Sequence, residues 1–298
     1  MYIPEIFSQF GYGNQIICAV STGGNMSLSD TFPDRQSIQI RRRDFEQELV
    51  GECGARFARI TLVHGTIVRP VEDSLPLPNE QADVMVTGTP GTYLWQNVAD
   101  CLAICIFDPE HQLCMQIHAG YAGVHRETIR SAIAYLVSRH GTNPARLLAY
   151  MPPAQQAASS LFSQLLKPEI SGNDWGFFRQ KIRLHGEMQK IHGARPFRLL
   201  WGDRAYSQLI RCGLLAHRIE RSTVDTYTAP DLFSHSQSSH DKRAPKGRQA
   251  VVFGMRFTIQ GVGGEESEHC KPSDRPNPMI RSLYGLHHRA YRRADVAL

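Results

Sequence analysis

The pattern of apolar and polar residues is most informative between Val98 and Gly123, a stretch that reads VADCLAICIFDPEHQLCMQIHAGYAG. Residues 101–107 form an almost unbroken apolar run, residues 108–110 are typical of a turn, and apolar residues alternate with other residues from Leu113 onward. Two strand patterns on either side of a turn predict a β-hairpin.

The register of this hairpin decides which side chains meet at its open end. If Phe107 lies opposite His111 or a residue next to it, counting back along both strands places Cys101 beside His118. A long helix is expected next, from Val124 to His140, and its first backbone N–H groups would favour an anion such as phosphate. The apolar side of that helix is expected to consist of Ile129, Ile133, Leu136 and Val137. The pattern therefore predicts that a thiolate, an imidazole and a helix N-terminus converge.

Similar patterns predict the other elements. Strands are expected at Ile16 to Val20, Phe57 to Val63, Asp83 to Thr87, Tyr93 to Val98, Leu147 to Tyr150, Ala216 to Arg221 and Gln249 to Thr258. Further helices are expected at Arg41 to Val50 and at Leu199 to Gly213. This alternation of strand, hairpin and helix favours an α+β fold with mixed, largely antiparallel β-sheets flanked by helices.

The chain divides into one large domain and a tail. No Gly/Ser-rich or Pro-rich linker interrupts the first 260 residues, so residues 1–260 are predicted to form a single domain. Beyond them the composition turns to Gly, Glu, Ser and Pro, and then to Arg and His. Residues 261–298 are therefore predicted to form a polar, basic and mobile tail.

Composition narrows the partners and the compartment. The 298-residue chain is 42% hydrophobic, enough for a full core, and its formal net charge is +5. Much of the positive excess lies in the tail without a recognition motif, which argues against specific nucleic-acid binding. No apolar run approaches the roughly 20 residues that span a bilayer, and MYIPEIFSQF lacks a signal-peptide pattern. Seven scattered cysteines argue against a disulfide scaffold, so a cytoplasmic protein is expected.

Two short motifs carry a resemblance to a known family. ADC at Ala99 to Cys101 and HAGYAG at His118 to Gly123 resemble the ADC and HAGWRG motifs of the bacterial polyphenol oxidase laccase-domain family. Members of that family are described as zinc-dependent purine nucleoside phosphorylases and adenosine deaminases, and the peptidoglycan editing factors are among them. The resemblance extends over about residues 16–257 and implies a single laccase-domain fold.

The resemblance also implies a metal site. VHG at residues 63–65 is similar to the family's Q-V-H-G segment, in which the histidine is a metal ligand, so His64 joins Cys101 and His118. Ligands of the types His, Cys and His match a catalytic zinc site, which keeps its fourth position open. Copper accepts the same ligands and is the second candidate metal. Cys105 cannot complete the site, because four residues along a strand place it about 13 Å from Cys101.

The implied reaction is that of a zinc-dependent purine nucleoside enzyme whose partners are a purine nucleoside and phosphate. It comprises deamination of adenosine, phosphorolysis of adenosine, inosine, guanosine or methylthioadenosine, or both. Cys101 and His118 are the candidate catalytic residues. The implied substrate contacts are Asp83, Asp100, Gly120, Tyr121, His235 and Arg248.

Three arginines of the family are missing from this chain. Ala122 stands where HAGWRG has its arginine, and Ser236 and Gln237 stand where the family's F-S-Y-R-R loop has two more. A hydrogen bond to a charged group is worth about 1.5–3 kcal/mol, so these losses weaken the expectation of phosphorolysis more than that of metal chemistry. Arg126, Arg248 and the helix N-terminus expected at Gly123-Val124 are candidate replacements.

Two other functions remain open. Cys101 activated by His118 could be the nucleophile of a metal-independent cysteine hydrolase or amidase, with activity that survives chelators but not alkylation. Alternatively, the chain is a catalytically impaired family member that acts by binding a partner, which the missing arginines favour. For Cys101 taken alone, a buried core cysteine is the simplest interpretation. Its expected meeting with His118 is what favours chemistry.

Overall fold

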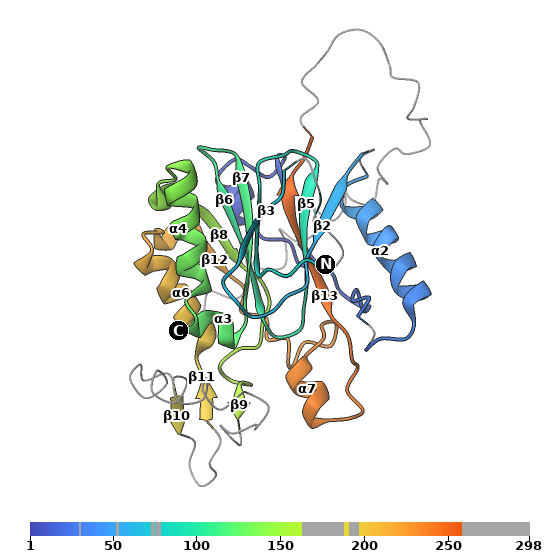
Figure 1. The fold of residues 1–298 in the computed structure, drawn as a ribbon. Coiled ribbons are helices and arrows are strands. Elements are labelled where there is room, and N and C mark those ends of the chain that lie inside the picture. Colours follow the sequence, from blue (N-terminus) through green and yellow to red (C-terminus); the bar gives the residue numbers. More distant parts are fainter. Residues whose placement is uncertain are drawn as a thin grey trace, which may run out of the picture.

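The computed structural model describes residues 1–257 apart from residues 30, 52–53, 73–74, 76–78, 163–187 and 191–196. The predicted tail at residues 261–298 lies outside the described residues. Within the described part, two β-sheets pack face to face and helices cover their outer faces (Figure 1). One apolar core lies between the sheets, and one lies between each sheet and its helices.

The strands are β1 (Ile16–Val20), β2 (Arg56–Arg59), β3 (Val68–Pro70), β4 (Val84–Thr87), β5 (Thr92–Val98), β6 (Leu102–Asp108), β7 (Leu113–Ala119), β8 (Leu148–Met151), β9 (Leu161–Phe162), β10 (Met188–Lys190), β11 (Phe197–Leu199), β12 (Ile219–Arg221) and β13 (Gln249–Met255). Six form the larger sheet, in the order β12-β8-β6-β7-β4-β3, and four form the second, in the order β1-β13-β5-β2. A small sheet has the order β10-β11-β9. Most neighbours are antiparallel, while β2 with β5, β3 with β4 and β8 with β12 are parallel. The predicted α+β fold with mixed, largely antiparallel sheets is confirmed.

The helices are α1 (Ile6–Gln9), α2 (Arg35–Leu49), α3 (Tyr121–His125), α4 (Thr128–His140), α6 (Trp201–Arg211) and α7 (His235–His240), with 3-10 turns η1 (Pro144–Arg146) and η2 (Ala216–Arg218). Helices α4 and α6 cover the outer face of the six-stranded sheet, and α2 covers that of the four-stranded sheet (Figure 1). No helix among the described residues has the length and apolar character needed to cross a membrane.

The β6–β7 hairpin lies in the middle of the six-stranded sheet and is buried on both faces. Alternate residues of β6 contact the helix-side core (Leu102, Ile104, Ile106) and the inter-sheet core (Ala103, Cys105, Phe107). A strand covered on both faces requires apolar residues at every position, which explains the unbroken run in the sequence. In β7, Gln116 and His118 alternate with residues of the helix-side core and therefore face the other sheet.

The register of this hairpin differs from the predicted one. Phe107 pairs with Cys114, three residues beyond His111. The turn comprises residues 109–112, because the Asp108 carboxylate accepts two backbone N–H groups within it and stabilises this longer loop. The open end is shifted accordingly, yet the thiol and the imidazole still meet there.

The helix predicted from Val124 to His140 is interrupted. Helix α3 ends at His125, Glu127 adopts a left-handed conformation with φ of 60°, and α4 begins at Thr128. A residue at positive φ breaks the helical hydrogen-bond ladder. Val137 is 43% exposed, so its expected place on the apolar side of the helix was wrong. The helix that begins beside the hairpin is therefore the short α3.

Other predicted elements occur with shifted ends. The helix expected from Arg41 begins six residues earlier, where the Asp34 side chain caps its N-terminus. The strand expected at residues 57–63 ends at Arg59, and the first half of the one expected at residues 216–221 is the 3-10 turn η2. The remaining predicted strands and the helix α6 agree with the structure to within three residues at each end.

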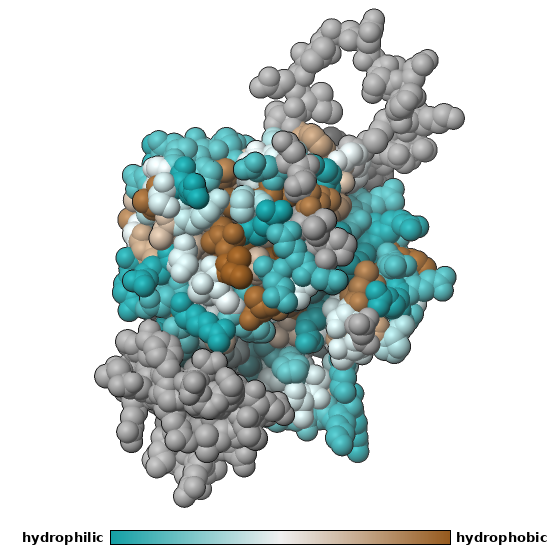
Figure 2. Space-filling model, viewed as in Figure 1, coloured by the Kyte–Doolittle hydropathy of each residue, from teal (hydrophilic) through white to brown (hydrophobic). Residues whose placement is uncertain are grey.

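An apolar patch borders the edge of the six-stranded sheet. Figure 2 shows a largely hydrophilic face with apolar residues gathered near the centre of the view, where Figure 1 draws β3 and nearby loops. Ile67, directly before β3, is 55% exposed and is the most exposed large apolar residue in the described part of the chain. It lies three residues after His64, so apolar surface borders the loop that carries this histidine.

Candidate metal centre

Three side chains from separate segments meet at the open end of the hairpin. They are His64 in the loop after β2, Cys101 immediately before β6, and His118 in β7, and their ligand atoms all lie within 4.8 Å of one another. The rings of the two histidines lie edge to face with centroids 4.7 Å apart. His118 is buried, Cys101 is partly buried and His64 is exposed. The structure thus brings together the three residues predicted as ligands, at a place that solutes reach.

The buried carboxylate of Asp83 holds both histidines. Its Oδ1 lies 2.8 Å from Nδ1 of His118. The same oxygen accepts the backbone N–H groups of Val63 at 3.2 Å and His64 at 2.8 Å, and Oδ2 accepts that of Gly65 at 2.6 Å. Because Nδ1 of His118 is engaged by this carboxylate, Nε2 is the nitrogen left for a metal ion.

The loop that carries His64 is also held by the junction between α3 and α4. His64 has a φ of 58°, which is uncommon for a residue other than glycine. The Arg126 guanidinium donates to the carbonyl oxygen of His64 at 2.5 Å, and Oγ1 of Thr128 donates to that of Gly65 at 2.7 Å. A backbone conformation of this kind persists only where surrounding contacts stabilise it. The α3–α4 junction therefore helps to position His64.

Removing the Thr128 hydroxyl tests this positioning. Thr128→Val keeps the shape of the side chain and loses the hydroxyl that lies 2.7 Å from the Gly65 carbonyl and 3.0 Å from the Gly123 carbonyl. The bond to Gly65 is worth about 1 kcal/mol. Metal affinity is therefore expected to fall about fivefold in chelator competition, and Thr128→Ser is expected to restore most of it. Equal affinity of the valine variant and the wild type would show that this bond does not position His64.

Gly120, the N-cap residue of α3, leaves the space that this group needs. A Cβ atom at this position would lie 2.6 Å from Cys101 Sγ and 3.3 Å from His64 Cδ2. The backbone φ of Gly120 is −69°, which any residue adopts. Glycine is therefore required here by the close approach of the thiol and not by backbone conformation.

A methyl group at this position is expected to displace the thiol. Gly120→Ala should lose stoichiometric metal on dialysis while it keeps a cooperative thermal unfolding transition. Gly202→Ala in α6 is the matched control, because its Cβ would meet only the end of the Arg221 side chain, at 3.0 Å. Full metal content in Gly120→Ala would contradict the proposed role of this space.

The thiol and one imidazole are charged before any metal binds. Burial raises the pKa of Cys101, but hydrogen bonds and charges from His118 and His64 outweigh it and lower that pKa to about 6. Burial lowers the pKa of His118, but hydrogen bonds and charges from Asp83 and Cys101 outweigh this effect and raise that pKa to about 9. Between these two values a thiolate faces an imidazolium. A metal ion that binds there has to displace the proton on His118.

The donors fit a metal site with three protein ligands. Nitrogen and sulfur ligands about 2.0–2.3 Å from a tetrahedral ion lie roughly 3.3–3.8 Å from one another. The ligand atoms here, all within 4.8 Å of one another, need only small shifts to reach that spacing. A carboxylate behind a histidine ligand, as Asp83 lies behind His118, is the usual outer partner. Within the described residues, this group comprises three candidate ligands, His64, Cys101 and His118.

Comparison with known proteins decides the family. The family model described as multi-copper polyphenol oxidoreductase laccase matches residues 19–256. The chain belongs to this family. The resemblance carried by the ADC and HAGYAG motifs is therefore confirmed.

Relatives of this laccase-family protein are named purine nucleoside phosphorylases. One from Mycobacterium bovis is 29% identical over 232 residues, which are 77% of this chain and 84% of the relative. One from Deinococcus radiodurans is 30% identical over 136 residues, 45% of this chain and 52% of the relative. One from Bacteroides thetaiotaomicron is 24% identical over 151 residues, 51% of this chain and 53% of the relative. The matches thus span about half the length of the latter two relatives.

Solved structures show the same fold. The hypothetical protein YfiH of Bacillus licheniformis superimposes with a TM-score of 0.69 at 20% identity, covering 85% of this chain and 96% of that one. YlmD from Geobacillus stearothermophilus gives a TM-score of 0.63 at 18% identity, covering 81% and 92%. At these identities the likeness establishes the fold.

In this laccase-family protein, two residues predicted as substrate contacts, Asp83 and Asp100, hold in place the segments that carry the candidate ligands. Asp83 is fully buried, and its carboxylate is engaged by His118 and by backbone N–H groups. Asp100, with a φ of 80°, accepts hydrogen bonds from Oγ1 of Thr226 at 2.8 Å and from the backbone N–H of Ser236 at 2.7 Å. Asp100 thus ties the segment before the thiol to the start of α7.

The other predicted substrate contacts are spread around the group. The ring of Tyr121 lies edge to face with that of His125, with centroids 4.6 Å apart, beside the helix-side core. His235 is exposed at the first position of α7. Burial lowers the pKa of Arg248, and the charges of Cys101 and Asp100 act in the opposite direction. The Arg248 guanidinium therefore lies within electrostatic range of the thiolate.

Shorter side chains occupy the positions of the family's missing arginines. Ala122 lies in α3, and Ser236 and Gln237 lie in the first turn of α7. The backbone N–H of Gln237 donates to Oγ of Ser234, which caps this turn. Hydrogen bonds to Ser234 and Asp100 thus order the start of α7 without either arginine.

Sequence reasoning missed the positioning contacts. It predicted Arg126 only as a substitute for the missing arginines and predicted no role for Thr128. Asp83 offered a usable signal, because an aspartate immediately before a largely apolar strand has to find hydrogen-bond partners when the strand is buried. Its partners come from two other segments, and the local pattern does not name them.

Proposed function

We propose that this protein is a zinc-dependent enzyme that acts on purine nucleosides, by phosphorolysis or by deamination of adenosine. The observation that carries the proposal is the convergence of His64, Cys101 and His118 with Asp83 behind them. Zinc is preferred to copper because His and Cys ligands with one open position are typical of catalytic zinc. The names of the relatives supply the substrate class.

The residues of the chain have distinct tasks in this proposal. Zinc bound by the three ligands supplies Lewis-acid chemistry at its open position. Asp83 keeps the ring of His118 oriented with Nε2 toward the ligand group, and Gly120 leaves room for the thiolate. The exposed side chain of Ile67 offers apolar surface for a purine base.

Phosphorolysis needs cationic groups for phosphate as well. Arg126 donates to the backbone carbonyl of His64, and the charge of Cys101 acts on Arg248, so these two guanidinium groups are the cations that the proposal uses. We assign phosphate binding to these two arginines in place of the three that the family has at positions 122, 236 and 237. If Arg126 and Arg248 do not bind phosphate, the proposed reaction is deamination of adenosine.

The test is metal content together with product analysis. Purified wild type is expected to carry about one zinc ion per chain, and His64→Ala much less, because one of the ligands is lost. Adenosine with phosphate should give adenine and ribose 1-phosphate if phosphorolysis operates, and adenosine alone should give inosine if deamination operates. His240→Ala, an exposed histidine on α7, is the matched control and should keep both zinc and activity.

Each outcome assigns a function. Zinc with a nucleoside product supports the proposal and identifies the reaction. Zinc without turnover of any purine nucleoside supports a metal-bearing binding protein. Wild type without zinc, under conditions in which it folds, would refute the metal site.

One observation favours a second function, that of a cysteine hydrolase or amidase. The pKa of Cys101 near 6 and that of His118 near 9 describe a thiolate beside an imidazolium, which is the state of an activated cysteine nucleophile. Such activity would survive chelators, would be lost on thiol alkylation, and would not depend on His64. The His64→Ala variant therefore separates the two functions.

A further inference from the structure

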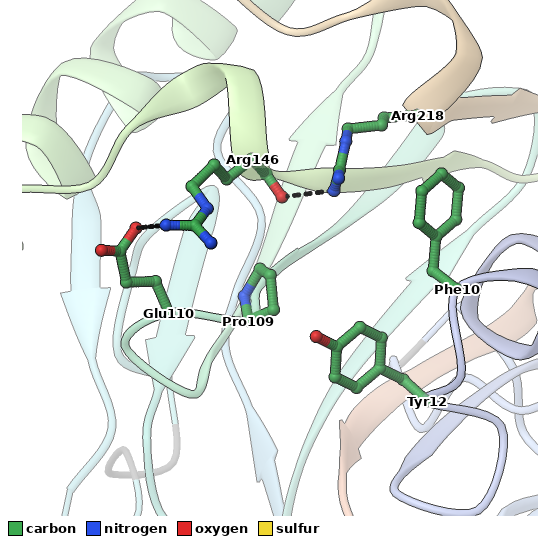
Figure 3. Close-up of a pocket in the computed structure, with 6 residues that line it drawn as sticks. All are labelled: Phe10, Tyr12, Pro109, Glu110, Arg146 and Arg218. Atoms are coloured by element: carbon green, nitrogen blue, oxygen red, sulfur yellow. Dashed lines mark hydrogen bonds and ion pairs between the residues drawn. The ribbon is translucent and has the colours of Figure 1, made fainter.

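A hollow lies at the other end of the β6–β7 hairpin, at the turn. It has a volume of about 300 Å³ and is lined by Phe10, Tyr12, Pro109, Glu110, Arg146 and Arg218 (Figure 3). These residues come from the segment after α1, the hairpin turn, η1 and η2. Strand β6 separates the hollow from the candidate metal centre by about 20 Å. It is therefore distinct from the site described above.

The walls of this hollow are held in place by hydrogen bonds and packing. The buried Asp108 carboxylate accepts the backbone N–H groups of Glu110 and His111, and Oγ1 of Thr142 donates to it at 2.5 Å. The ring of Tyr12 lies edge to face with buried Phe107, with centroids 5.0 Å apart. The hollow is thus preformed, which lowers the entropic cost of binding a ligand.

Two guanidinium groups border the hollow. The Arg218 guanidinium lies 4.7 Å from the centroid of the Phe10 ring and donates to the carbonyl oxygen of Arg146 at 3.0 Å, so stacking and a hydrogen bond both hold it. Arg146 contacts the Glu110 carboxylate at 3.4 Å, and the two side chains are 62% and 43% exposed. An exposed pair this long contributes little energy, so an incoming anion can displace Glu110.

We propose that this hollow binds a small anion carried on a flat ring, such as an aromatic carboxylate or an aromatic phosphate monoester. The ring packs against Pro109 with the Tyr12 hydroxyl beside it, while Phe10 keeps its contact with the Arg218 guanidinium (Figure 3). The anion takes the place of the Glu110 carboxylate at Arg146 and is shared with Arg218. Two arginines and one glutamate leave the lining with a formal charge of +1, which favours an anion.

Calorimetric titration with defined probes tests this proposal. Benzoate and phenyl phosphate carry both the ring and the anion, benzyl alcohol carries the ring alone, and inorganic phosphate carries the anion alone. Both ring-bearing anions are expected to bind with one-to-one stoichiometry and at least tenfold more tightly than either partial probe. A heat with only one of the two anions would narrow the ligand to carboxylates or to phosphate esters.

Variants of the lining residues show whether the heat of binding comes from the hollow. Arg146→Met and Arg218→Met are each expected to weaken binding at least tenfold, whereas Arg43→Met, on exposed α2 surface, should leave it unchanged. Glu110→Gln removes the competing carboxylate and is expected to strengthen binding several-fold, a gain that misfolding cannot produce. The titrations are repeated on His64→Ala, so that an anion at the candidate metal centre is not counted.

Three results would overturn the proposal. They are no heat from either ring-bearing anion at millimolar concentration, equal binding of benzyl alcohol, and affinities that do not change in the Arg146, Arg218 and Glu110 variants. Loss of all binding in His64→Ala would likewise overturn the proposal, because it would show that the anion binds at the metal centre and not in the hollow. None of these results depends on whether the protein turns over purine nucleosides.

Discussion

Asp83→Asn is expected to lower zinc affinity by about 10- to 100-fold, the usual effect of removing a carboxylate behind a histidine ligand. The variant loses the negative charge that orients His118, and one side of the new amide meets the backbone N–H groups that the carboxylate accepted. A single substitution thus disturbs two ligands at once. Competition with a chromophoric zinc chelator above pH 9, where His118 has lost its competing proton in both proteins, measures the change.

Asp108→Asn is the matched control for this experiment. Asp108 is also buried, lies 2.8 Å from a histidine nitrogen, that of His111, and accepts backbone N–H groups, but it lies at the turn of the hairpin. Both variants are expected to unfold at lower temperature, because each weakens a buried hydrogen-bond network. Only Asp83→Asn should lose zinc affinity. An equal loss in both variants would mean that Asp83 acts through general stability and not through ligand positioning.

Zinc affinity is expected to rise about 1000-fold between about pH 6 and about pH 9. Above pH 6 Cys101 is already a thiolate, while His118 keeps its proton until the pH approaches 9. Zinc binds neutral imidazole and therefore displaces that proton, which costs a factor of about ten for each pH unit below the pKa of His118. The apparent affinity should accordingly increase about tenfold per pH unit in this window and level off above it.

Zinc-buffered titrations across this range, with proton release followed by calorimetry in two buffers, check the prediction. At least one proton should be released per zinc ion at pH 7. Asp83→Asn provides an internal test, because without the carboxylate the pKa of His118 falls and the plateau should begin at lower pH. An affinity that stays constant from pH 6 to pH 9 would show that His118 is neutral before zinc arrives.

The missing arginines make the comparison of the two reactions informative. Hydrogen bonds already order the first turn of α7, where Ser236 and Gln237 stand, so losing these arginines does not unravel the element. Metal binding relies on a different set of contacts, around Asp83 and Gly120. Changes at Arg248 are therefore expected to alter phosphate affinity without altering metal affinity, whereas changes at Arg126, which also holds the loop of His64, are expected to affect both.

The sequence by itself determined the fold class and most of the elements. Strand β6 was readable because a strand covered on both faces requires an unbroken apolar run, and β1 and β13 share that property. The two motifs identified the family, and a hairpin brings its own ends together, so Cys101 and His118 could be paired from local pattern alone. The choice of His64 as their partner came from the resemblance and not from any periodicity.

Only the tertiary structure decided the geometry of the site. The three-residue shift in hairpin register follows from the Asp108 turn, and the interruption of the long helix at Glu127 delivers Arg126 and Thr128 to the loop of His64. The left-handed backbone of His64 is held by Asp83, from another segment. Alternation and burial are local properties that residue types record along the chain. Ligand geometry depends on hydrogen bonds between distant segments, and residue types alone do not record which segments meet.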